Sequence, residues 1–139
     1  MQRMFADTDP AIISGNGGPS TLSNISTVLI KSKDKALTLS ASSALSELDG
    51  YRLIFCEDDN SAKSRLDEVN VDLILYDVDE DDFGPDNALA RSRLSHTACW
   101  RIVICEKNEM SCGAQLCEDT ESYLYLAKPV QEQQIRIVV

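Results

Sequence analysis

The sequence Val71-Asp72-Leu73-Ile74-Leu75-Tyr76-Asp77 is an apolar run that ends on a carboxylate and leads into the acidic segment at residues 79–82. A short apolar run bounded by polar residues is typical of a strand buried on both faces, as in a parallel sheet covered by helices. Asp77 would then lie at the carboxyl end of this strand. Because ligands bind at that edge of open α/β sheets, Asp77 is a candidate for chemistry.

Four further strands are predicted on either side of this run. They are the β-rich segments Thr27–Ile30, Tyr51–Cys56, Trp100–Cys105 and Tyr123–Leu126. Between them, apolar residues recur at helical spacing over residues 37–48, 62–69, 89–94 and 110–117. Strand and helix therefore alternate five times with short connections. This order predicts an α/β fold with a doubly wound, five-stranded parallel sheet.

Capping signals suggest where the helices begin and end. The first helix is expected to start at Asp34 and to stop at Gly50. We expect Asn60 or Ser61 to cap the second helix, and Asp86 or Asn87 to cap the third.

The last unit is shorter than the others. Only Gln131–Val139 follows the fifth strand, so a closing helix of the usual length of about 11 to 12 residues hardly fits. A truncated helix would leave Ile135, Ile137, Val138 and Val139 as apolar surface on an open flank. Such a surface favours association with a partner.

Composition limits the classes of function. The 139 residues include 23 acidic and 13 basic side chains, giving a formal charge of −10 and a pI near 4.4. This charge repels nucleic acid and anionic lipid, and no apolar run reaches the roughly 18 residues of a membrane span. We expect a cytoplasmic protein with a flexible arm at residues 1–26 and one domain at residues 27–139.

The cysteines and the single histidine suggest no catalytic or zinc site. Five scattered cysteines lack the paired spacing of zinc ligands, and a reducing compartment would keep them as thiols. Cys56 and Cys105 lie in predicted strands, where we expect small buried apolar side chains. A redox role for Cys112 and Cys117 remains open. His96 has no neighbouring nucleophile motif, so we interpret it as an exposed loop residue.

The polar residues that end the third and fifth predicted strands carry a family resemblance. Asp77 ends the third, and Lys128-Pro129 ends the fifth, 51 positions later. Together with Gly50-Tyr51 and with Tyr125, which lies three residues before Lys128, this order resembles the receiver domain of response regulators, the CheY-like superfamily, over Thr27–Val139. The resemblance implies a flavodoxin-like (βα)5 fold, a cis peptide before Pro129 and a switch aromatic at Tyr125.

The resemblance also implies a phosphorylation site, which this sequence alters. In receivers the acceptor Asp attacks the phosphoryl group of a phosphohistidine, and Mg²⁺ is held by the acceptor and an acidic pair after the first strand. Asp77 matches the acceptor and Lys128 the phosphoryl-sensing lysine, but Lys31 and Ser32 replace the acidic pair. Glu106 stands where the family has Thr or Ser. Asp34 lies two residues beyond the pair and is a doubtful ligand.

The replacements suggest a hypothesis for the site. Lys31 near Asp77 could supply the positive charge that a metal would bring, and Glu106 could pair with Lys128, closing the site to a phosphoryl group. The first interpretation is therefore a pseudo-receiver in two-component (phosphorelay) signalling. It would have no cofactor and no enzymatic activity, and it would signal through protein contacts.

The alternative is a phosphoacceptor receiver, phosphorylated on Asp77 by a histidine kinase with Mg²⁺. It would show at most weak autocatalytic phosphotransfer and dephosphorylation, using Asp77 and Lys128, with Asp34 assisting a metal. In either case the resemblance implies a partner face around Cys112–Val139, formed by the fourth helix, the fifth strand and the C-terminal end. The partner could be a kinase, an output domain or a second copy of the chain. A small-molecule enzyme is disfavoured because the sequence has no nucleophile–base pair.

Overall fold

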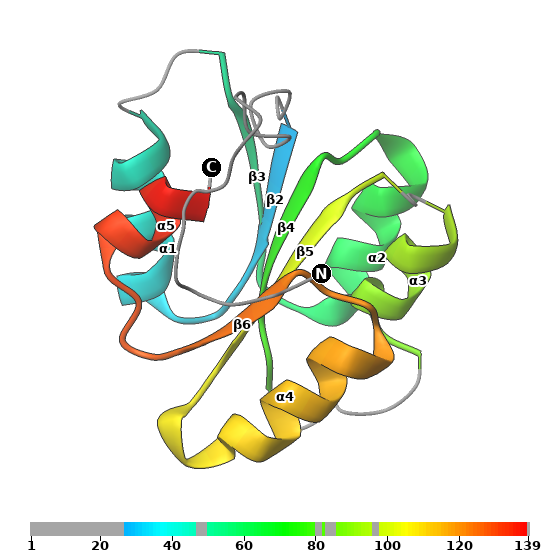
Figure 1. Ribbon diagram of the computed structural model, residues 1–139. Helices are drawn as coiled ribbons and strands as arrows, with labels where there is room; N and C mark the ends of the chain where they lie inside the picture. Colours follow the sequence, from blue (N-terminus) through cyan, green and yellow to red (C-terminus); the bar gives the residue numbers. More distant parts are fainter. Residues whose placement is uncertain (1–26, 47–49, 80–81, 83–85, 96–97, 139) are drawn as a thin grey trace, which may run out of the picture.

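A single parallel sheet organises the chain (Figure 1), and the computed structural model describes residues 27–46, 50–79, 82, 86–95 and 98–138. Its strands are β2 (Thr27–Lys31), β3 (Arg52–Cys56), β4 (Leu73–Asp77), β5 (Trp100–Cys105) and β6 (Leu124–Ala127), in the order β3-β2-β4-β5-β6. The helices are α1 (Lys35–Ser46), α2 (Asp59–Glu68), α3 (Ala88–Ser95), α4 (Met110–Asp119) and α5 (Glu132–Val138), with a 3-10 turn, η3 (Lys107–Glu109). The predicted doubly wound (βα)5 fold is confirmed.

Strand β4 is the centre of the sheet. It pairs in parallel with β2 on one side and with β5 on the other, and all five of its residues are buried. Leu73 and Leu75 pack into the core on the α1 and α5 face, whereas Ile74 and Tyr76 pack into the core beneath α2, α3 and α4. Helices on both faces leave no solvated side to the strand, which explains its continuous apolar run.

Two helix starts show how local polar groups set the boundaries. Helix α2 begins at Asp59, and its N-cap is Asp58, whose Oδ1 accepts the Ser61 amide at 2.8 Å. The predicted caps Asn60 and Ser61 are therefore wrong, because the earlier carboxylate satisfies the first turn. Asn87 does cap α3, since its Oδ1 accepts the Ala90 amide at 2.9 Å.

Gly50 occupies the turn before β3 with a φ of 90°, a conformation that glycine adopts without strain. Helix α1 is described as far as Ser46, and the predicted final turn with Leu48 lies outside the described residues. His96, the arm at residues 1–26 and Val139 also lie outside them, as do the side chains of Ile137 and Val138.

The closing helix α5 is short, as predicted, but it does not leave Ile135 exposed. The Ile135 side chain is 1% exposed and belongs to the same core cluster as Ala41 and Ala44 of α1. The predicted apolar surface at Ile135 is therefore wrong, because two helical turns suffice to lay this residue on α1. In the described part of the chain, no helix is long and apolar enough to cross a membrane.

Four of the five cysteine side chains are buried: Cys56, Cys99, Cys105 and Cys117. The prediction for Cys56 and Cys105 is confirmed. Cys112 is exposed, and all five are free thiols.

Candidate functional site

Three strands bring polar side chains together at their carboxyl ends. Asp77 ends β4 and is only 3% exposed. Its Oδ2 accepts the Ser32 hydroxyl at 2.6 Å and is 2.8 Å from the Lys128 Nζ. Burial raises the pKa of Asp77, although its hydrogen bonds with Lys128 and Ser32 oppose the shift. The acceptor position is thus a buried carboxyl already engaged by two neighbours.

Lys128 is the centre of a cluster of acidic side chains. Its Nζ lies 2.8 Å from Asp77 Oδ2, 3.1 Å from Asp34 Oδ2 and 3.5 Å from Glu106 Oε2. Burial alone would lower the pKa of Lys128, but its hydrogen bonds to Asp77 and Asp34 raise it above the ordinary value. The pairing that we expected between Glu106 and Lys128 is present, with Glu106 as the more distant and more exposed partner.

Asp34 both caps α1 and reaches the site. Its Oδ1 accepts the Ala36 amide at 3.0 Å and the Leu37 amide at 3.4 Å, which is the geometry of an N-cap. Its Oδ2 faces Lys128. Burial would raise the pKa of Asp34, yet the hydrogen bond and the charge of Lys128 hold it below the ordinary value.

Lys31 forms a second centre of ion pairs, and its side chain is 1% exposed. The Nζ donates to the main-chain oxygen of Asp77 at 2.6 Å, to Asp82 Oδ2 at 2.6 Å and to Asp79 Oδ2 at 3.2 Å. Lys31 therefore lies near Asp77, as expected, but its contact is with the main-chain oxygen of Asp77, and the two carboxylates that follow β4 take its other hydrogen bonds.

The surroundings of Tyr76 were not predicted from the sequence. The Lys31 Nζ lies 4.7 Å from the centroid of the Tyr76 ring, a cation–π contact. The Tyr76 hydroxyl donates to Asp59 Oδ1 at 2.5 Å, and the same oxygen accepts the Ala88 amide at 2.7 Å. Burial raises the pKa of Tyr76. The one available signal was a tyrosine in an aliphatic strand, because a buried hydroxyl requires a partner.

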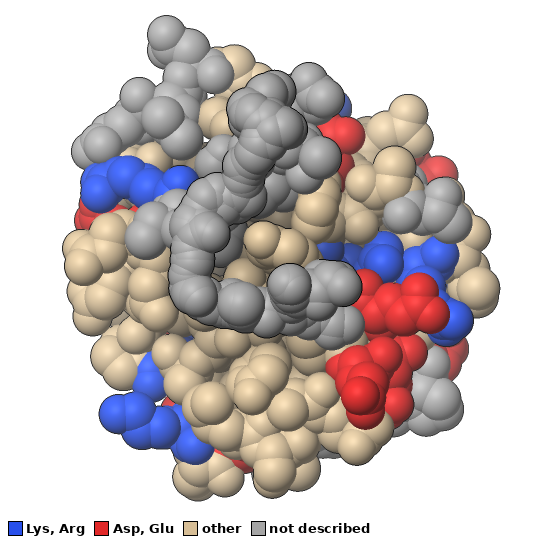
Figure 2. All heavy atoms as spheres, viewed as in Figure 1, with Lys and Arg blue, Asp and Glu red and all other residues tan. Residues whose placement is uncertain are grey.

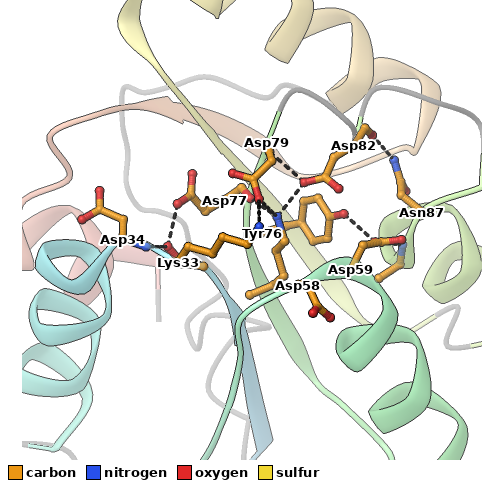
Figure 3. Close-up of polar contacts among 12 residues, drawn as sticks. Lys33, Asp34, Asp58, Asp59, Tyr76, Asp77, Asp79, Asp82 and Asn87 are labelled. Carbon is orange, nitrogen blue, oxygen red and sulfur yellow. Dashed lines mark hydrogen bonds and ion pairs between the residues drawn. The ribbon is translucent and has the colours of Figure 1, made fainter.

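Asp82 connects Lys31 to the start of α3. Its Oδ2 also accepts the Asp79 amide at 2.7 Å, and its main-chain oxygen accepts the Asn87 side chain at 2.7 Å. Figure 3 shows Asp79 and Asp82 pointing toward the same point, with Asn87 reaching Asp82 from the α3 side. A run of acidic residues after a strand is usually a solvated loop, so the sequence alone did not indicate that Asp82 is buried.

The remaining predicted features lie on β6 and just beyond it. Tyr125 is 39% exposed, so its ring is accessible to a partner. The Lys128–Pro129 peptide is cis, as the resemblance implied.

The residues at the receiver-type metal position do not fit a divalent cation. An ammonium group, Lys31, and a hydroxyl, Ser32, stand where carboxylates would be needed. Among the described residues, no group of three or more His, Cys, Asp or Glu side chains is arranged to hold a metal ion. We therefore derive no step that passes through a metal.

Comparison with known proteins gives fold-level relatives. No family model matches the sequence, and no curated protein matches it significantly. Among solved structures, the receiver domain of an HD domain-containing protein from Pseudomonas fluorescens Pf-5 is 26% identical, with a TM-score of 0.67 over 80% of this chain and 88% of that one.

Two further structures are similar at lower identity. A response regulator from Thermotoga maritima is 20% identical, with a TM-score of 0.63 over 81% of this chain and 92% of that one. The chemotaxis response regulator CheY4 of Vibrio cholerae is 15% identical, with a TM-score of 0.63 over 80% of this chain and 92% of that one. These similarities confirm the fold and the resemblance drawn from the sequence.

Proposed function

We propose that this chain, whose fold is that of response regulator receiver domains, serves two-component signalling as a pseudo-receiver. It keeps the receiver fold and the Asp77–Lys128 pair, but it does not use Mg²⁺-dependent phosphorylation. It acts in the cytoplasm through contacts with a protein partner. The observation that carries this proposal is the buried Lys31 ammonium at the position of the metal-binding acidic pair.

Hydrogen-bond capacity supports the proposal. An ammonium group has three donors and no acceptor. Lys31 faces three oxygens, those of Asp77, Asp79 and Asp82, and Lys128 also faces three, those of Asp34, Asp77 and Glu106. A phosphoryl group would therefore have to displace carboxylates that already hold both cations.

Charge also opposes phosphorylation. A phosphoryl group adds a charge of about −1.5 to −2. It would enter beside Glu106 and Asp34, both within 3.5 Å of Lys128, and no divalent cation would screen the repulsion.

The partner face is proposed on α4, β6 and α5, the region from Cys112 to the C-terminal end. Tyr125 is exposed on β6, and Figure 2 shows a largely uncharged surface over α4 in the lower part of the view. A surface depleted of charge favours protein association. The proposed partner is a histidine kinase, an output domain or a second copy of the chain.

Intact-mass measurement after incubation with acetyl phosphate and MgCl₂ tests the proposal. A phosphorylation-competent receiver serves as the positive control, and Asp77→Asn serves as the site control. We expect no added phosphoryl group on the wild-type chain, because its acceptor carboxyl and both ammonium groups are engaged.

The alternative function is a phosphoacceptor receiver. The 2.8 Å contact between Asp77 and Lys128 favours it, because both residues are in position to take part in phosphoryl transfer. A gain of one phosphoryl group that requires Mg²⁺ and disappears in Asp77→Asn would establish the alternative and overturn the pseudo-receiver.

A further inference from the structure

We propose that the Lys31 ammonium is a built-in replacement for a divalent cation, and that its removal turns its surroundings into a Mg²⁺-binding site. The inference rests on the proposed function and deepens it by naming what holds the site in one state. Lys31 holds the Asp79 and Asp82 carboxylates in place by itself, so neither metal nor phosphoryl group is needed to hold them.

The ligand set around Lys31 is the first support. Two carboxylate oxygens, from Asp79 and Asp82, and one carbonyl oxygen, from Asp77, converge on the Nζ within 3.2 Å. Carboxylates and carbonyls are the ligands that Mg²⁺ prefers, and water completes its shell. The three oxygens thus surround the Lys31 ammonium as they would surround a bound metal ion.

Burial is the second support. The side chain of Lys31 is 1% exposed and that of Asp82 is 6% exposed, whereas Asp79 is 40% exposed. A buried carboxylate that loses its partner is left with an uncompensated charge. The exposed side of Asp79 gives a dissolved cation access to the space that a shortened residue 31 would vacate.

The hydrogen bonds of Asp82 connect the Lys31 ammonium to the start of α3. One carboxylate oxygen of Asp82 accepts hydrogen bonds from the Lys31 ammonium and the Asp79 amide. Its main-chain oxygen accepts a hydrogen bond from the side chain of Asn87, the cap of α3. A continuous chain of contacts therefore runs from the end of β2 to the start of α3. With a covalently attached cation, this chain is complete in the absence of any ligand.

Melting temperatures with and without saturating MgCl₂, at constant ionic strength, test the inference. The proteins are the wild type, Lys31→Ala and the matched control Lys33→Ala. Lys33 is exposed and lies 3.8 Å from the same Asp79, so it controls for loss of a positive charge near that carboxylate. We expect Lys31→Ala to melt several degrees below the wild type and to regain most of the loss in MgCl₂. The wild type and Lys33→Ala should not respond.

A possible folding failure is covered by a second readout. If Lys31→Ala is unfolded without metal, circular dichroism follows its refolding in MgCl₂, with Lys31→Ser as a second variant. Recovery of structure in MgCl₂ by either variant supports the inference. Failure of both variants to respond to Mg²⁺, or a wild type that is itself stabilised by Mg²⁺, overturns it.

These outcomes are separate from those of the phosphorylation test. A wild type that accepts a phosphoryl group while Lys31→Ala gains Mg²⁺ stabilisation would refute the pseudo-receiver and keep the inference. A wild type that stays unphosphorylated while Lys31→Ala ignores Mg²⁺ would keep the pseudo-receiver and refute the inference.

Discussion

At the scale of single residues, Tyr76 links the two sides of the site. Its ring lies beneath the Lys31 ammonium and its hydroxyl bonds Asp59, which also accepts the first amide of α3. Tyr76, which precedes Asp77, thus contacts a cation with its ring and a carboxylate with its hydroxyl, and an aliphatic residue could make neither contact.

Tyr76→Phe keeps the ring and deletes the hydroxyl. We expect it to lower the free energy of unfolding by about 1.5–3 kcal/mol, the usual value of a hydrogen bond to a charged group. Urea denaturation measures the change. Tyr51→Phe is the matched control, because no hydrogen bond of the Tyr51 hydroxyl is found within the described residues. An equal loss in both variants would contradict a specific role for the Tyr76–Asp59 bond.

The sequence was sufficient to place some site residues and not others. Asp77 ends the buried strand β4 and Lys128 directly follows the edge strand β6, and parallel strands align their carboxyl ends, so their meeting was predictable. The partners of Lys31 were not, because Asp79 and Asp82 follow the strand and their directions depend on local hydrogen bonds. The contact of Asp59 with Tyr76 was also missed, because Asp59 lies on α2 and its direction cannot be derived from the sequence of β4.

At the scale of elements, Gly113 allows α4 to lie close against β5. A Cβ added at Gly113 would fall 2.6 Å from the Cys105 Sγ and 3.2 Å from its Cβ. Cys105 is fully buried in the sheet, so a shift of its side chain would disturb the packing around it. The close approach therefore needs a residue without a side chain.

Gly113→Ala should destabilise the domain despite its better helix propensity. Alanine gains about 1 kcal/mol over glycine within a helix, but overpacking costs about 1–3 kcal/mol. We expect a net loss of about 1 kcal/mol in urea denaturation. In a Cys105→Ala background the 2.6 Å contact with Sγ is gone and only the 3.2 Å contact with Cβ remains, so the same substitution should cost less. Destabilisation of equal size in both backgrounds would show that the contact with Cys105 is not the cause.

The helix boundaries show which element features a sequence predicts. Apolar spacing placed α1, α2, α3 and α4 correctly, because each covers the sheet with one face. The start of α2 was predicted too late because several neighbouring polar residues could cap it, and the structure shows that Asp58 is the cap. The burial of Ile135 was missed because a helix of seven residues still reaches α1.

At the scale of the whole molecule, burial of protonated groups makes the domain sensitive to alkali. Burial raises the pKa of the Cys56, Cys99 and Cys105 thiols, that of Cys99 from 9.0 to about 12. Between these pH values the folded chain keeps a proton that the unfolded chain has lost. Stability must then fall as pH rises.

Urea denaturation under reducing conditions, repeated from pH 8 to pH 11, measures this dependence. We expect the free energy of unfolding to fall above pH 9, with Cys99 contributing about 1.4 kcal/mol per pH unit. Cys99→Ala should flatten the slope, whereas Cys112→Ala, at an exposed thiol, should leave it unchanged. A slope that is the same in all three proteins would contradict the burial effect at Cys99.

The overall topology was predictable because strand-like and helix-like segments alternate along the chain around one strand buried on both faces. The contacts at the site depend on Lys31, Ser32 and Glu106, which replace the acidic pair and the hydroxyl residue found in receivers. Two lysines, Lys31 and Lys128, each hold three oxygens at the edge of the sheet where Asp77 lies.

The intact mass of the wild-type chain after incubation with acetyl phosphate and MgCl₂ shows whether these ion pairs close the site to phosphorylation. We expect an unchanged mass under conditions in which the control receiver gains one phosphoryl group. A Mg²⁺-dependent gain of one phosphoryl group, lost in Asp77→Asn, would contradict this expectation.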